Sequence, residues 1–312
     1  MKLVTYDVGG TPRAGLAVSG MIADLEKGAR ALRIGRLPSS TRALLEDGAA
    51  ATRRAERLAR KATQLAESVA SAKARRPAWL VPEEAVHLGP PVPDPEKIIC
   101  LGLNYLDHCR EQEGRFGRPI EPPPHPIIFS KFPSALTGPY DAIRLPPPRV
   151  TRQVDYEVEL AMVVGRTAKG VAQKDAMDYV AGFMVLNDVS ARDCQFADGQ
   201  WVRAKSFDTF APCGPWLTTR DEVPQPSRLR LWTALNGQTM QDSSTRHFIF
   251  KPARVIAFLS RAMTLRPGDL ISTGTPAGVG IFRDPPVTLG PGDTVECGIE
   301  GLGTLCNTCE RA

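Results

Sequence analysis

At 312 residues, the chain is long enough for one large domain, or for a large and a small one, with an extensive core. Its 42% hydrophobic residues, 23% charged residues and net charge of +5 are typical of an ordinary soluble globular protein. No apolar run approaches the roughly 18 residues of a membrane helix, and the first residues lack the apolar stretch of a secretory signal, so we expect neither a membrane protein nor a secreted one.

The first 92 residues are predicted to form a small N-terminal α+β domain. Short strands are expected at 2–7 and 14–19, a short helix after Ser40 or Thr41, and a longer helix at about 50–72 whose apolar stripe is rich in alanine. Residues 1–80 hold fifteen Lys and Arg against seven Asp and Glu. Because no aromatic residues are interleaved with these charges, we predict a solvated basic helix and no nucleic-acid partner, although the positive field would attract anionic substrates.

A proline-rich stretch at 90–95 predicts an extended linker, so we place a domain boundary between residues 92 and 93. Beyond it the predicted helices are at about 174–180 and 252–263. The predicted strands are at 97–102, 127–130, 183–187, 213–218, 229–235, 270–273 and 293–299. Many short strands with few helices predict an α+β protein that is mostly β, with a β-rich sandwich or roll in residues 93–312.

Seven cysteines, an odd number without framework spacing, favour free thiols in a reducing cytoplasm. Cys306 and Cys309 form a C-x-x-C pair, but a zinc site would need a second pair or nearby histidines, and the four histidines are distant in sequence. We therefore interpret the pair as structural and predict a cytoplasmic location.

Apolar and acidic residues alternate strictly between Val154 and Leu160, and the acids are Asp155, Glu157 and Glu159. On a strand such alternation gathers the acids on one face, with neighbouring acids about 6–7 Å apart. That spacing suits a hard divalent cation, although acids on the solvated face of an edge strand would give the same pattern. Asp188 closes a buried strand and is the best third ligand, with a turn cap as its alternative role.

His108 and Glu111 lie three residues apart in a polar segment and share a face if that segment is helical. A glutamate bonded to an imidazole fixes its tautomer and makes it a better base, although such a pair is also a common surface contact. The glycine-rich segment 274–280 lacks the Lys-Ser/Thr of a phosphate loop. Its backbone donors could hold a carboxylate, or the segment could be a simple turn.

These motifs, taken in order, resemble the fumarylacetoacetate hydrolase family over residues 97–309. The blocks that carry the resemblance are Gly102–Glu111, Val154–Leu160, Asn187–Asp193, Lys205–Thr209, Asn236–Ser243, Gly274–Gly280 and Gly292–Asp293. The resemblance implies a mixed β-sandwich roll, a homodimer and a Mg²⁺ or Mn²⁺ ion. The residues before 93 resemble the variable N-terminal domain of longer members.

The resemblance also implies site residues. The implied metal ligands are Glu157, Glu159 and Asp188. The implied catalytic residues are His108, Glu111 and Lys205. The implied substrate-binding residues are Tyr105, Gln195, Gly274 and Thr275. The further metal-binding aspartate of the human-type fumarylacetoacetate enzyme has no counterpart that we can place, so the pattern resembles the acylpyruvate-hydrolase branch.

We therefore expect a metal-dependent hydrolase that cleaves a C–C bond in a small anionic β-diketo acid of the acylpyruvate or fumarylpyruvate kind. His108, oriented by Glu111, would activate water, and Lys205 with Gln195 would offset the oxyanion. The closest alternative is decarboxylation or isomerisation of an oxo dicarboxylic acid, such as oxaloacetate or 2-hydroxyhepta-2,4-dienedioate, at the same site. The alternative of another class is a non-catalytic binding protein on the same fold.

Overall fold

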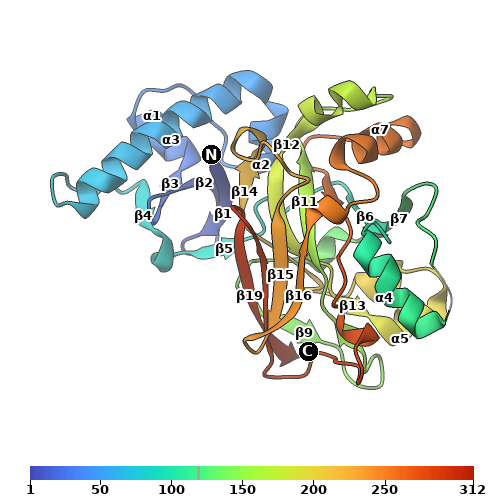
Figure 1. Cartoon of the computed structure of the whole chain (residues 1–312). Coiled ribbons are helices and arrows are strands. Elements are labelled where there is room, and N and C mark those ends of the chain that lie inside the picture. Colours follow the sequence, from blue (N-terminus) through green and yellow to red (C-terminus); the bar gives the residue numbers. More distant parts are fainter. Residues whose placement is uncertain (118–119) are drawn as a thin grey trace.

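Two large β-sheets with helices packed around them form the structure, a computed structural model that describes residues 1–117 and 120–312 (Figure 1). In these described parts of the chain, the larger sheet has twelve strands; its main path runs β4-β3-β2-β1-β14-β12-β11-β17-β6-β7, with β5 beside β1 and β8 beside β14. A five-stranded sheet has the order β16-β15-β18-β19-β9. The mostly β, mixed α+β fold predicted from the sequence is confirmed.

The N-terminal part places helices on a small antiparallel meander. Its strands are β1 (Lys2–Asp7), β2 (Pro12–Val18), β3 (Met21–Asp24), β4 (Leu80–Pro82) and β5 (His87–Gly89). Its helices are α1 (Leu25–Ala31), α2 (Thr41–Glu46) and α3 (Gly48–Ala70). Ser40 caps α2 as expected, because its hydroxyl accepts from the Ala43 N–H at 3.1 Å. The buried side of α3 is mostly alanine, which lets the helix approach the strands closely.

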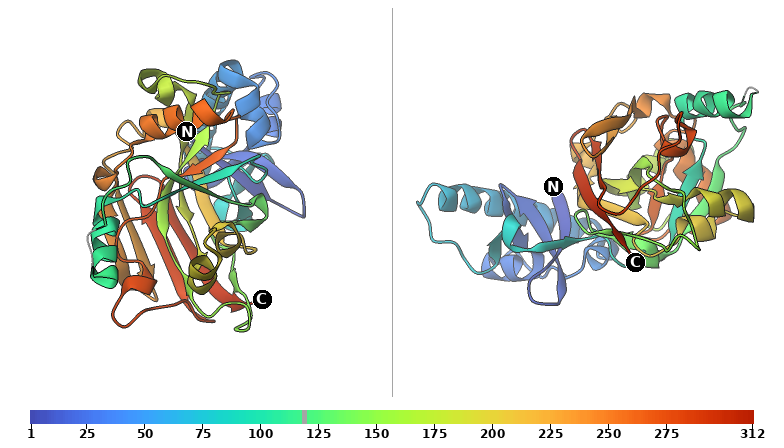
Figure 2. Two further views of the ribbon diagram at one scale, coloured as in Figure 1. Left: turned by 90° about the vertical axis from the view of Figure 1, so that its right-hand side faces the viewer. Right: turned by 90° about the horizontal axis from the view of Figure 1, so that it is seen from below.

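This part lies to one side of the remaining strands (Figure 2) but continues their sheet. β1 pairs antiparallel with β14, with Lys2 opposite Thr218. Leu3 and Leu58 belong to the same buried cluster as Met184 and Leu186 of β12. The boundary at residues 92 and 93 stays a prediction, and the sheet and one apolar cluster run across it.

The larger sheet continues through the centre of the molecule. Its strands there are β6 (Ile98–Gly102), β7 (Ile127–Lys131), β8 (Leu136–Thr137), β11 (Val158–Val164), β12 (Val180–Asn187), β14 (Ala211–Thr219) and β17 (Leu270–Ser272). β11 lies between β12 and β17 and every residue in it is buried. Glu159 in β11 and Glu157 directly before it are therefore buried, and they are not the surface acids of an edge strand.

The single alternating strand expected from Val154 onward is interrupted. β10 (Val154–Asp155) pairs with β13 (Ser190–Ala191) as a separate ribbon, and Tyr156 and Glu157 lie between β10 and β11. Asp155 accepts from the backbone N–H groups of Gly280 and Ile281, at 2.8 and 3.1 Å. Asp155 thus lies in β10 and Glu159 in β11, so the predicted row of three acids on one strand is wrong.

The second sheet and its connections complete the fold. Its strands are β9 (Ile143–Leu145), β15 (Arg230–Leu235), β16 (Gln238–Ser244), β18 (Thr294–Ile299) and β19 (Gly303–Arg311). The remaining helices are α4 (Leu106–Phe116), α5 (Arg192–Asp198), α6 (Val202–Lys205) and α7 (Pro252–Ala262). Short 3₁₀ turns are η1 (Glu83–Ala85), η2 (Pro133–Ala135), η3 (Gln173–Tyr179), η4 (Arg220–Glu222), η5 (Thr245–His247) and η6 (Gly280–Phe282).

All seven cysteines lie in the described residues and are free. Cys306 is exposed and Cys309 is buried on the same strand. Among the described helices, none combines the length and the apolar character that crossing a bilayer requires.

Candidate metal centre and active site

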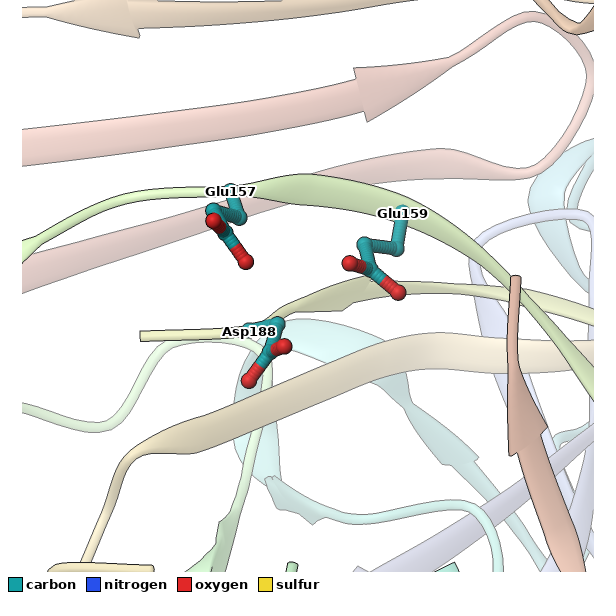
Figure 3. Close-up of side chains that lie close together, drawn as sticks. All are labelled: Glu157, Glu159 and Asp188. Atoms are coloured by element: carbon teal, nitrogen blue, oxygen red, sulfur yellow. The ribbon is translucent and has the colours of Figure 1, made fainter. Parts of the chain in front are cut away.

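Three buried carboxylates meet where β11 and β12 lie side by side. Glu157 directly precedes β11, Glu159 is its second residue, and Asp188 directly follows β12. The backbone N–H of Asp188 donates to the carbonyl of Glu157 at 2.8 Å, which sets the two acids next to each other. One oxygen from each carboxylate lies within 4.8 Å of the others (Figure 3). Strand pairing thus assembles the predicted acid triad from segments about thirty residues apart.

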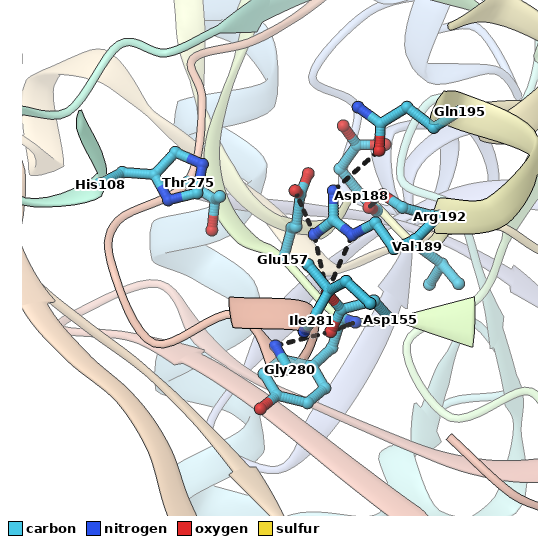
Figure 4. Close-up of polar contacts among 12 residues, drawn as sticks. His108, Asp155, Glu157, Asp188, Val189, Arg192, Gln195, Thr275, Gly280 and Ile281 are labelled. Carbon is cyan, nitrogen blue, oxygen red and sulfur yellow. Dashed lines mark hydrogen bonds and ion pairs between the residues drawn. The ribbon is translucent and has the colours of Figure 1, made fainter. Parts of the chain in front are cut away.

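Buried cations surround two of the three acids. The Lys205 Nζ lies 2.6 Å from Glu157 Oε2 and 2.7 Å from Asp188 Oδ2. Lys131, at the end of β7, places its Nζ 2.5 Å from Asp188 Oδ1. The Arg192 guanidinium bridges Glu157 Oε1 at 2.6 Å and Asp155 Oδ2 at 2.8 Å (Figure 4). No sequence motif predicted a role for Lys131 or Arg192.

Glu159 has a different environment, because the groups that donate hydrogen bonds to it are uncharged. Its Oε2 accepts from Ser272 Oγ at 2.5 Å and from the Gly274 N–H at 2.9 Å. Burial and the charges of Asp188 and Glu157 raise the pKa of Glu159 well above its ordinary value. Burial acts in the same direction on Glu157, but the charges of Arg192 and Lys205 hold the pKa of Glu157 well below its ordinary value.

The centre therefore has an excess of buried negative charge. The buried acids are Asp155, Glu157, Glu159 and Asp188, and the buried bases are Lys131, Arg192 and Lys205. An unpaired carboxylate in the interior is costly, and a cation near Glu159 would offset that cost. All three converging ligands are carboxylates, the donors that Mg²⁺ and Mn²⁺ prefer. The residues present thus fit a hard divalent ion.

His108 and Glu111 lie on α4 and face each other as predicted. The His108 Nδ1 is 2.9 Å from Glu111 Oε2, and Glu111 Oε1 accepts from the Gly278 N–H at 2.7 Å. The glycine-rich segment 274–280 therefore holds the glutamate that orients the imidazole. On its other side, His108 Nε2 lies 3.1 Å from Nε2 of Gln112, a residue that no sequence motif singled out.

His108 of the His108–Glu111 dyad and two acids of the triad, Glu157 and Glu159, line one cavity of about 220 Å³. Its polar lining is His108, Gln112, Glu157, Glu159, Arg192, Gln195, Lys205 and Thr275. Its apolar lining is Leu101, Leu103, Phe129, Phe196, Trp201 and Phe282, together with Gly102. An imidazole, two cationic side chains and two of the three carboxylates thus face the same small space.

Two of the expected substrate-binding residues reach this cavity. Gln195 is on α5, and its Oε1 accepts from Arg192 Nη1 at 3.0 Å, so its amide nitrogen is the group that remains to donate. Thr275 Oγ1 donates to the Val158 carbonyl at 3.0 Å. Figure 4 shows His108 and Gln195 on opposite sides of Glu157 in that view.

The other two expected substrate-binding residues have different places. Gly274 does not line the cavity, and its N–H is used by Glu159, so it orients a carboxylate of the centre. Tyr105 is fully buried and its ring packs against Phe248, with centroids 4.8 Å apart. Because Tyr105 does not line the cavity, the structure gives no support for its expected contact with substrate. A large aromatic residue next to a helix start is as compatible with a core as with a site, and the contact of Tyr105 with substrate stays a prediction.

Residues 97–310 match the profile of the family described as "Fumarylacetoacetate (FAA) hydrolase C-terminal". The chain is 48% identical over 229 residues to "Oxaloacetate tautomerase Fahd2a, mitochondrial" of Rattus norvegicus, a match that covers 73% of this chain and 71% of the relative.

Two solved structures are similar along the whole chain. The first is that of a putative HpcE protein from Mycobacterium smegmatis, with a TM-score of 0.80, 34% identity and 100% of both chains covered. The second is that of a maleylpyruvate hydrolase from Sphingobium, with a TM-score of 0.72, 31% identity and 100% of both chains covered.

Proposed function

Since the chain belongs to the fumarylacetoacetate hydrolase family, we propose that it is an enzyme that interconverts the keto and enol forms of a small 2-oxo dicarboxylate of the oxaloacetate kind. Glu157, Glu159 and Asp188 would hold Mg²⁺ or Mn²⁺. The observation that carries the proposal is that His108, paired with Glu111, lines the same cavity as Glu157 and Glu159. The tautomerase name of the rat relative supports this choice of reaction.

A divalent ion bound at the three acids would supply Lewis-acid polarisation of the substrate's 2-oxo group. The chain's own contribution begins with His108. A carboxylate accepts hydrogen bonds, so Glu111 fixes the proton of a neutral imidazole on Nδ1 and leaves the lone pair on Nε2. That nitrogen would take a proton from C3 of the substrate. The electron pair of the C3–H bond then forms the C2–C3 double bond, and the negative charge moves to the oxygen on C2.

The developing negative charge needs donors that are already in place. Lys205 and the amide nitrogen of Gln195 line the cavity and would stabilise this oxygen. His108 would then return the proton to the oxygen, which gives the enol with no net gain or loss of atoms or electrons. Raising the rate by this route requires a base that is held in place. Glu111 holds the His108 imidazole, and the Gly278 N–H in turn holds Glu111.

The expected hydrolysis of an acylpyruvate becomes the second candidate. The dyad that would take a proton from carbon could instead activate water, and the similarity to a maleylpyruvate hydrolase favours this reaction. The tautomerase relative is more similar in sequence, at 48% against 31% identity, so we place isomerisation first. A homodimer and a cytoplasmic location stay predictions, and light scattering in solution tests the first of them.

The test uses the full chain, treated with a chelator and then supplied with Mg²⁺ or Mn²⁺. The rate of keto–enol exchange of oxaloacetate is compared with the uncatalysed rate, and acetylpyruvate is offered in parallel while pyruvate and acetate are measured. We expect metal-dependent exchange that exceeds any cleavage. Metal-dependent cleavage of acetylpyruvate without catalysed oxaloacetate exchange would replace the first candidate with the second, and failure of both would overturn the proposal.

A further inference from the structure

Gln112 lies one helical turn beyond His108 on α4 and contacts the imidazole at Nε2, the nitrogen opposite Glu111. Its amide nitrogen is 3.1 Å from His108 Nε2. Both side chains line the cavity that contains Glu157 and Glu159. The amide therefore occupies the position from which a substrate proton would reach the base.

The direction of this hydrogen bond follows from the other side of the ring. Glu111 accepts from Nδ1, so in the neutral imidazole Nε2 has no proton and can only accept. The Gln112 amide nitrogen carries two protons and can only donate. Gln112 thus covers the lone pair of the base, and His108 cannot take a proton from carbon until this amide has turned to another acceptor.

The cavity indicates which acceptor would draw the Gln112 amide away from His108. Both cations of the lining already have carboxylate partners, because Lys205 contacts Glu157 and Asp188 and Arg192 contacts Asp155 and Glu157. A substrate with a second carboxylate brings an anion that needs a donor. In oxaloacetate that carboxylate is bonded directly to C3, the carbon that gives up its proton, so it arrives beside His108 and within the neighbourhood of Gln112.

We propose that Gln112 recognises the distal carboxylate of the substrate, and that its turn from His108 to this carboxylate uncovers the base. This proposal rests on the proposed function, and it names the protein group that would bind the distal carboxylate of the substrate. It makes the base available when a dicarboxylate is bound and keeps it covered otherwise. Gln112 is in this sense a specificity-determining residue that also positions His108.

The first experiment measures binding, so that it does not depend on turnover. Malate and 2-hydroxybutyrate are unreactive analogues of similar size, and they differ in having or lacking the distal carboxylate. Calorimetry with Mg²⁺ present compares them in the wild type, in Gln112→Leu and in the control Gln64→Leu, which alters an exposed glutamine of α3. We expect the wild type and the control to prefer malate. Loss of a hydrogen bond to a charged group should reduce that preference by about 10- to 100-fold in Gln112→Leu.

The second experiment follows the imidazole itself in the protein without metal. Loss of the hydrogen bond that Gln112 donates to Nε2 should shift the ¹⁵N resonance of this nitrogen in Gln112→Leu, whereas the control Gln64→Leu should leave it unchanged. A glutamine that merely completes the helix surface would leave the resonance unchanged in both variants.

An unchanged malate preference in Gln112→Leu, or a wild type that binds both analogues equally, overturns the recognition role. An unchanged ¹⁵N resonance of His108 Nε2 in Gln112→Leu overturns the proposal that Gln112 covers the base. These failures differ from failure of the proposed function, which would appear as a wild type that binds malate selectively and yet does not catalyse oxaloacetate exchange.

Discussion

Two buried carboxylates, Asp24 in the N-terminal part and Glu159 at the candidate metal centre, have opposite environments although each is 1% exposed. Asp24 accepts from Arg13 Nε at 2.6 Å, from Tyr6 Oη at 2.8 Å and from the Lys27 N–H at 2.7 Å. Glu159 accepts from a hydroxyl and a backbone N–H. Burial tends to raise both pKa values, but the donors around Asp24 hold its pKa below the ordinary value, whereas the pKa of Glu159 rises well above it.

The difference separates a carboxylate that belongs to the fold from one that belongs to a site. A buried acid with a cation and several donors has its charge and its hydrogen bonds satisfied by the protein alone, and it serves as a helix cap or stabilises a turn. A buried acid without a cation, next to other acids and to a cavity, is satisfied only when something positive binds. Each prediction below tests this distinction, beginning with the largest expected effect.

The largest effect should come from the centre itself. Glu157→Gln, Glu159→Gln and Asp188→Asn each remove a charged ligand, so the affinity for Mg²⁺ or Mn²⁺ should fall by more than about 100-fold, the upper effect of changing outer-shell partners. Turnover should be lost with it. Calorimetry measures the affinity, and Asp198→Asn, which alters an acid of α5 outside the cavity lining, serves as the control. Unchanged affinity in all three variants would disprove a metal site here.

The dyad should give the next largest effect. His108→Ala removes the base, so the rate of oxaloacetate exchange, or of cleavage if the second candidate is correct, should fall by about 10²–10⁴-fold while the metal affinity stays the same. Glu111→Gln should have a smaller effect, because Glu111 orients the imidazole and does not receive the proton. Steady-state kinetics at saturating metal measures both. Full activity in His108→Ala would place the base elsewhere.

Stability without metal should distinguish the acids from one another. Asp188→Asn leaves Lys131 and Lys205 without a full counter-charge in the interior, which should lower the free energy of unfolding by about 3–5 kcal/mol. Glu159→Gln removes a charge that has no cation, so it should be neutral or stabilising. Urea unfolding of the protein without metal compares them. If both variants lost the same stability, the asymmetry between these acids would have no energetic meaning.

The sequence was informative where chemistry and spacing coincide. Glu157, Glu159, Asp188 and the His108–Glu111 pair were all predicted, and strand pairing and one helix turn bring them together. Local spacing made these groups candidates, because they are adjacent to apolar strands or lie three residues apart on a helix. Their roles as ligands and as a catalytic pair came from the resemblance to the family.

Other features depend on contacts between distant segments. Lys131 is the last residue of β7 and contacts Asp188, which lies 57 residues later, and no local sequence pattern predicts this contact. β16 and β19 are rich in polar residues and became strands through pairing with β15 and β18. Asp155 follows the same alternation as its neighbours, but its carboxylate accepts from the backbone N–H groups of Gly280 and Ile281 at the 3₁₀ turn η6. Tertiary contacts overrode the local pattern in each of these cases.

The smallest effect should come from the acid that belongs to the fold. Asp24→Asn keeps the shape but loses the charge that pairs with Arg13 and caps α1, so the free energy of unfolding should fall by about 1–3 kcal/mol at pH 7. Because the pKa of Asp24 is lower in the folded protein, its contribution is fully present above the unfolded value of about 3.9 and is lost as the pH falls through the folded value. The gap in stability between wild type and Asp24→Asn should therefore narrow below pH ~4.

Urea unfolding at several pH values measures this gap, with Glu26→Gln as the control, since Glu26 is an exposed partner of the same arginine. A gap that stayed constant down to low pH would mean that Asp24 acts through packing and not through its charge, and the contrast with Glu159 would then rest on the metal centre alone.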